Sequence, residues 1–173
     1  MINFIVAEVS SSEVLRSQVL EIAVVVVDRK FNICQISPVL TSHRDIDLPM
    51  DADRYAQYSQ NGLLDECAST VRRQHNIDDL LLEWLGHSNT MTRWPTVFGS
   101  ALERSVVRVL LPGFFKKMAT TDIVSADINT TKYIVPARAL ERVLYNISCL
   151  KLLYNQQLTS DQTCVQPVGS VLR

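Results

Sequence analysis

The stretch Val19–Val27, VLEIAVVVV, decides how this sequence folds. It is rich in β-branched residues and apolar on both faces, which predicts a strand buried in the centre of a sheet. A shorter apolar run, Phe4–Val9, precedes it, and Ile33–Leu40 follows the turn at Asp28–Asn32. Three adjacent strands with short connections predict an antiparallel meander.

Residues 41–58 are polar and loop-like, and the remaining chain alternates helical and extended patterns. Helices are predicted at 63–68, around 78–86, at 102–111 and at 136–155, with short strands at 94–98 and 121–126. The apolar spacing of the third helix predicts an inward face of Leu102, Val106, Val109 and Leu110. This order indicates an α/β domain in which helices flank a mixed five-stranded sheet. The domain is expected to span 1–155, followed by a polar, flexible tail at 156–173.

Composition limits the possible functions. The chain has 173 residues, which fits one domain, and 47% of them are hydrophobic. The net charge is −1, so no general basic field attracts nucleic acid, and any such contact must be local. The four cysteines are scattered without zinc spacing. The longest apolar run, Ile22–Val27, is too short to cross a membrane, and no signal peptide is recognisable, so we expect a cytoplasmic protein with reduced thiols.

Four segments, in this order and spacing, resemble one known family. They are FIVAEVSSS at 4–12, LEIAVVVVD at 20–28, MDADRYAQYSQNGL at 50–63 and ALERVLY at 139–145. Together they resemble the oligoribonucleases, which are DEDDh 3′–5′ exonucleases with an RNase H-like fold. The resemblance implies a homodimer and two divalent ions, Mg²⁺ or Mn²⁺, held between carboxylates.

The residues at the implied catalytic positions depart from this pattern. Glu8, Ser10, Glu103, Ala137 and Arg142 stand where the resemblance implies Asp, Glu, Asp, His and Asp. A fixed arginine charge about 4 Å from a cation costs about 4 kcal/mol near a protein surface. Ala137 also lacks a group that could take a proton from water. The sequence therefore predicts a pseudo-exonuclease, without a metal, that binds a protein partner or a short RNA 3′ end.

Alternatives remain open at these positions. If the register of the last helix slips by one residue, Arg142 faces solvent and Glu141 becomes a carboxylate of the site. Glu8, Glu103 and Glu141 would then hold a metal ion in a divergent, active 3′–5′ exoribonuclease that acts on short RNA. Glu103 also fits a plain interaction with the helix dipole.

Substrate contacts are predicted in the segment 50–63. Asp53, Tyr58 and Asn61 stand where the resemblance implies Trp, His and Ser. An acid at the first of these positions repels phosphate, whereas Tyr58 is able to stack on a base. Tyr58 and Asn61 are thus the candidate substrate-binding residues.

Overall fold

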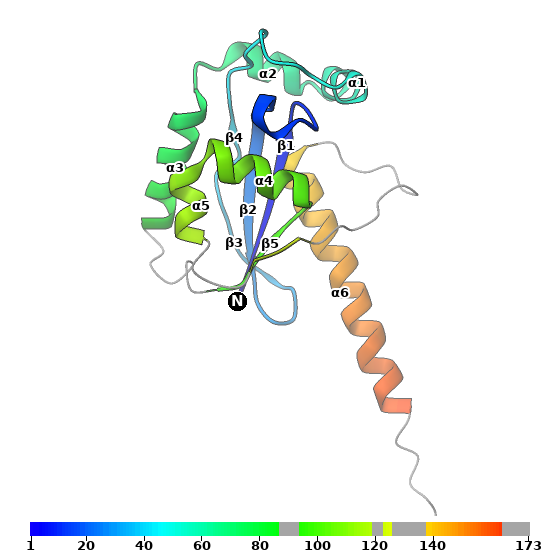
Figure 1. The fold of residues 1–173 in the computed structure, drawn as a ribbon. Coiled ribbons are helices and arrows are strands. Elements are labelled where there is room, and N and C mark those ends of the chain that lie inside the picture. Colours follow the sequence, from blue (N-terminus) through cyan, green and yellow to red (C-terminus); the bar gives the residue numbers. More distant parts are fainter. Residues whose placement is uncertain (87–93, 119–122, 126–137, 164–173) are drawn as a thin grey trace, which may run out of the picture.

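Strand β2 (Val19–Val27) lies inside the sheet, and all of its residues are buried. The computed structural model describes residues 1–86, 94–118, 123–125 and 138–163. In this part of the chain, helices lie on both faces of a mixed sheet, which confirms the predicted α/β class (Figure 1). No helix of the described residues has the length and apolar character needed to span a membrane.

Five strands lie side by side in the order β3-β2-β1-β5-β6, and β4 pairs with β2 as well. The first three form the predicted antiparallel meander, whereas β5 is parallel to β1 and β6 is parallel to β5. The other strands are β1 (Ile2–Val9), β3 (Ile33–Ile36), β4 (Leu40–Thr41), β5 (Thr96–Phe98) and β6 (Ile123–Ser125).

The predicted strand 33–40 is divided into β3 and β4. Pro38 has no N–H to donate to a sheet ladder. Just before it, the Ser37 hydroxyl accepts a hydrogen bond from Val24 N at 2.9 Å, so a side chain takes over part of the ladder. Both short strands still pair with β2.

The helices are α1 (Ala52–Gln60), α2 (Leu63–Ser69), α3 (Gln74–Gly86), α4 (Ala101–Leu110), α5 (Pro112–Met118) and α6 (Ala139–Thr163), with a 3₁₀ turn η1 at Val14–Arg16. Three expectations need correction. Residues 52–58 are helical rather than loop-like. Val109 is 45% exposed, and Glu103 and Val107 occupy the buried face of α4 instead. Helix α6 also continues past Asn155 to Thr163.

Alternate residues of the central strands enter two separate cores. One core contains Ile5 and Ala7 of β1 and packs on α3, α4 and α5. The other contains Phe4 and Val6 of β1 with Ala23 of β2, and it packs on α6. Because successive strand residues point to opposite faces, the α6 side also receives residues 8 and 21.

Candidate functional site

Each of the two central strands carries one acid among apolar residues. Glu8 of β1 is 2% exposed and Glu21 of β2 is 1% exposed. They are direct partners in the antiparallel register, so both side chains lie on the face covered by α6. Buried carboxylates need charged or hydrogen-bonding partners, which the neighbouring helices supply.

Glu103 reaches the same region from α4. Strand β5 ends at Phe98, and Glu103 Oε2 accepts a hydrogen bond from Ala7 N of β1 at 3.0 Å. The carboxylate thus accepts a hydrogen bond from β1 just beyond the point where the parallel strand β5 ends. Ser100 caps α4 by accepting from Glu103 N at 3.1 Å, and its hydroxyl also bonds Glu103 Oε1.

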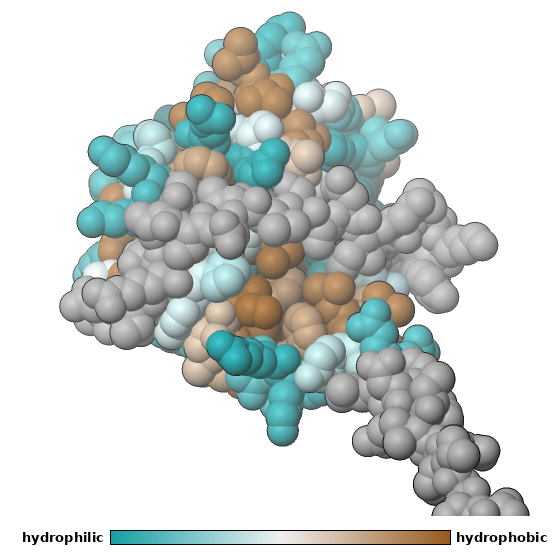
Figure 2. Space-filling model, turned by 60° about the horizontal axis from the view of Figure 1, so that its bottom comes forward, coloured by the Kyte–Doolittle hydropathy of each residue, from teal (hydrophilic) through white to brown (hydrophobic). Residues whose placement is uncertain are grey.

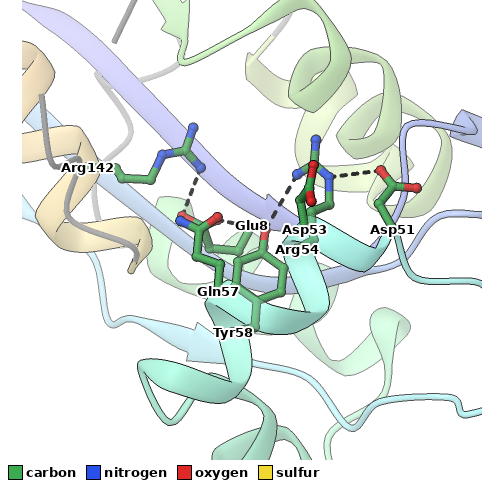
Figure 3. Close-up of a pocket in the computed structure, with 7 residues that line it drawn as sticks. All are labelled: Glu8, Asp51, Asp53, Arg54, Gln57, Tyr58 and Arg142. Carbon is green, nitrogen blue, oxygen red and sulfur yellow. Dashed lines mark hydrogen bonds and ion pairs between the residues drawn. The ribbon is translucent and has the colours of Figure 1, made fainter. Parts of the chain in front are cut away.

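Arg142 of α6 lies between these two acids. Its Nη1 donates to Glu8 Oε1 at 2.8 Å, and its Nη2 donates to Glu103 Oε1 at 2.7 Å. We call Glu8, Glu103 and Arg142 the Arg142 cluster. Figure 3 shows the guanidinium directed at Glu8 from α6. Both acids are almost fully buried, and the arginine side chain is 22% exposed.

The Arg142 cluster combines two carboxylates with one guanidinium. Burial raises the pKa of Glu8 more than Arg142 lowers it, and the nearby charge of Glu103 adds a smaller upward contribution. For Arg142, burial acts to lower the pKa, but the two carboxylates outweigh it and raise the pKa above its usual range. The guanidinium is therefore permanently charged, and it is shared between the two carboxyl groups.

Tyr58 of α1 completes the surroundings of Glu8. Its hydroxyl donates to Glu8 Oε2 at 2.9 Å and lies 3.2 Å from Val9 O. Burial and the Glu8 carboxylate raise the pKa of Tyr58. The residue is only 1% exposed, and its ring packs with Leu20 and Leu63, so the ring is not free to stack on a base.

A hollow of about 450 Å³ opens over the Arg142 cluster. Helix α1 forms one wall, and Arg54 there contacts Asp51 at 3.1 Å (Figure 3). Hydrogen bonds from Ser12 N and Arg54 lower the pKa of Asp51 despite opposing desolvation. The lining residues are Glu8, Asp51, Asp53, Arg54, Gln57, Tyr58 and Arg142. Three of the lining residues are acids, and the two lining arginines already bond to acids or to the backbone. The hollow therefore offers little attraction to phosphate.

The other predicted site residues lie elsewhere. Ser10 is buried, and its hydroxyl accepts from Gln18 N at 3.0 Å, which closes the connection between β1 and β2. Asn61 ends α1, where its Oδ1 accepts from Leu63 N. Glu141 is on the exposed side of α6 and is not brought to Glu8 and Glu103. Ala137 lies outside the described residues.

A second arginine with two acidic partners, Arg138, was not predicted from the sequence. Arg138 Nε contacts Glu21 Oε2 at 2.8 Å, and its Nη2 contacts Glu66 of α2. The hydrogen bond to Glu21 raises the pKa of Arg138, and Glu66 raises it further. Together the two acids outweigh burial, which acts to lower that pKa. The available signal was one acid in each apolar strand, matched by two arginines four residues apart at the start of the last helix.

Comparisons with known proteins add no family assignment. The sequence matches no protein-family model, and it finds no significant match among curated proteins.

Proposed function

We propose that this protein is an RNase H-like, exonuclease-type domain that no longer hydrolyses RNA and acts by binding. The meander of β1, β2 and β3, continued by the parallel strands β5 and β6, is compatible with such a scaffold. Glu8 and Glu103 come together at the carboxyl ends of the parallel strands β1 and β5, an edge where α/β sheets often carry their sites.

The observation that carries this proposal is the position of Arg142. Its two hydrogen bonds, of 2.8 and 2.7 Å, occupy one oxygen each of Glu8 and Glu103. The remaining oxygens accept from Tyr58 and from Ala7 N. The donor set does not fit a two-metal centre, because a cation would meet engaged carboxylates and a fixed positive charge.

An active exoribonuclease that uses Mg²⁺ or Mn²⁺ is the weaker proposal. It requires Glu141 to join Glu8 and Glu103 as a ligand. Glu141 is exposed, whereas its neighbour Arg142 points to the two acids. This arrangement favours the register in which the arginine occupies the site.

Two kinds of partner are proposed, a short RNA and another protein, including a second copy of the chain. Exposed apolar residues support a protein partner. They are Ile33 and Ile36 on β3, and Leu152 and Leu153 on α6. Figure 2, viewed from the end where β1 starts, shows a hydrophobic area with hydrophilic side chains beside it. Scattered apolar residues are common on protein surfaces, so they give weaker support than a charged pocket.

The test is an activity assay with a thermal readout. Purified protein is incubated with short RNA and Mg²⁺ or Mn²⁺, and the products are separated by size. We expect intact RNA and an unchanged melting temperature on adding either metal. Release of mononucleotides that stops when the metal is chelated would overturn the proposal. Light scattering tests the predicted homodimer separately.

A further inference from the structure

A second concave surface lies on α4 and α5, apart from the hollow over the Arg142 cluster. It is a hollow of about 310 Å³ lined by Arg104, Ser105, Arg108 and Phe115, and it shares no lining residue with the first. We propose that this surface, the α4–α5 pocket, binds single-stranded RNA. This inference rests on the proposed binding function and names its ligand and location.

The charge of the pocket suits a polyanion. Arg104 and Arg108 stand one helical turn apart on α4, so their side chains lie on the same face. Among the described residues, neither guanidinium pairs with a carboxylate, in contrast to the ion pairs of Arg138 and Arg142. Guanidinium groups match phosphate oxygens in charge and geometry.

The neighbouring acid does not cancel this charge. The segment 101–118 contains one acidic residue, Glu103, and four basic residues. Its carboxylate is turned inward and already contacts Arg142 at 2.7 Å. The exposed side of α4 is thus locally basic although the chain as a whole has a net charge of −1.

Phe115 supplies an aromatic surface beside the arginines. It is half-buried, and its ring centroid lies 6.0 Å from that of Phe98, which holds the ring on one side. Asp78 fixes the start of α5 by accepting from Gly113 N and Phe114 N at 2.9 and 2.7 Å. A ring held in this way is able to stack on a base at low entropic cost.

Ser105 adds a feature that favours ribose over deoxyribose. Its hydroxyl donates to Ala101 O at 2.9 Å, so its lone pairs are left to accept a hydrogen bond. A ribose 2′-hydroxyl is a donor that deoxyribose lacks. Two phosphate-binding arginines, a stacking ring and this acceptor together describe a site for RNA rather than for free phosphate.

The experiment measures binding of fluorescently labelled RNA pentanucleotides by anisotropy at several salt concentrations. The variant R104A/R108A should bind at least tenfold more weakly. Each lost phosphate contact lowers the steepness of log K against log salt by about 0.7, so two should lower it by about 1.4. The control R29A/K30A removes two charges from an exposed turn and should bind like the wild type.

Two further variants test the ligand class. Phe115→Leu keeps an apolar contact with Phe98 but loses the stacking surface, and it should weaken binding about fivefold or more. Ser105→Ala should weaken RNA binding more than binding of the corresponding DNA. Equal affinities of R104A/R108A and R29A/K30A, or no RNA binding by the wild type at low salt, would overturn the inference. Metal-dependent hydrolysis would instead overturn the proposed function and leave this surface to be judged by the variants.

Discussion

Glu8 lies directly opposite Glu21 across β1 and β2, and each acid pairs with a different arginine: Glu21 with Arg138, just before α6, and Glu8 with Arg142, in the first turns of α6. Like charges in directly opposed positions destabilise a sheet when they have no partners. Arg138 and Arg142 are spaced to meet this pair because residues four apart lie on one helix face. The docking of α6 on the sheet is therefore electrostatic as well as apolar.

Replacing Arg142 by methionine should destabilise the fold. Glu8 and Glu103 would then share a buried site without a cation, and breaking one side of a buried ion pair costs about 3–5 kcal/mol. Urea unfolding measures the free energy. Arg104→Met is the matched control, because the described residues offer that side chain no carboxylate, and it should stay within about 0.5 kcal/mol of wild type.

The same variant should gain an affinity for divalent ions. Without the guanidinium, two carboxylates with no cation between them become able to bind Mn²⁺. We expect Mn²⁺ to raise the melting temperature of Arg142→Met and to leave that of the wild type unchanged. An equal response of both proteins would show that the arginine does not control the site.

The stability should depend on pH in a way that Glu8 explains. The pKa of Glu8 is raised in the folded protein, from an ordinary value of 4.5, mainly by burial. A folded state that holds the proton more tightly loses stability as pH rises through this range, by up to about 1.4 kcal/mol per pH unit. The difference in unfolding free energy between wild type and Glu8→Gln should fall from pH 4.5 upward. A flat difference would contradict the prediction.

Gly99 should not tolerate a side chain. A Cβ there would lie 2.7 Å from Glu103 Oε2 and 3.1 Å from Val6 Cγ2, which would displace the carboxylate from Ala7 N. Gly99→Ala should cost about 1–3 kcal/mol. At Gly86 a Cβ meets no atom of the described residues within 4 Å, so Gly86→Ala is the control and should be close to neutral. Comparable losses in the two variants would argue against the contact.

Removing the hydroxyl of Tyr58 should leave Glu8 with an unsatisfied oxygen. Tyr58→Phe deletes the hydrogen bond of 2.9 Å and should cost about 1–3 kcal/mol, because both partners are buried. Tyr55 on the same helix is 49% exposed and provides the control Tyr55→Phe. Chemical denaturation of the two variants makes the comparison, and a neutral Tyr58→Phe would exclude an energetic role for this contact.

Much of the fold could be predicted because its signals are local. The uninterrupted run Val19–Val27 identifies the buried strand, and the two short runs beside it identify the meander. Helix α1 was not predicted because its sequence ADRYAQYSQ is mostly polar, and Tyr58 is the residue that it buries. The buried face of α4 differs from its apolar pattern because Glu103 is buried there with Arg142 as its charged partner.

The site could be predicted only where the resemblance to exonucleases marked it. The resemblance to exonucleases directed attention to Glu8, Glu103 and Arg142, which the structure brings together. It also directed attention to Asn61, which serves as a helix end. The pairing of Arg138 with Glu21 joins residues 117 positions apart, and no local pattern specifies such a contact.

The position of α6 in the chain has a consequence for synthesis. The guanidinium that neutralises Glu8 is attached 134 residues further along. While a ribosome is still producing the middle of the protein, the first two strands have opposed acids and no counter-charge. Burial of these two acids therefore waits until the last helix has emerged, and fragments that end before it should be substrates for proteolysis.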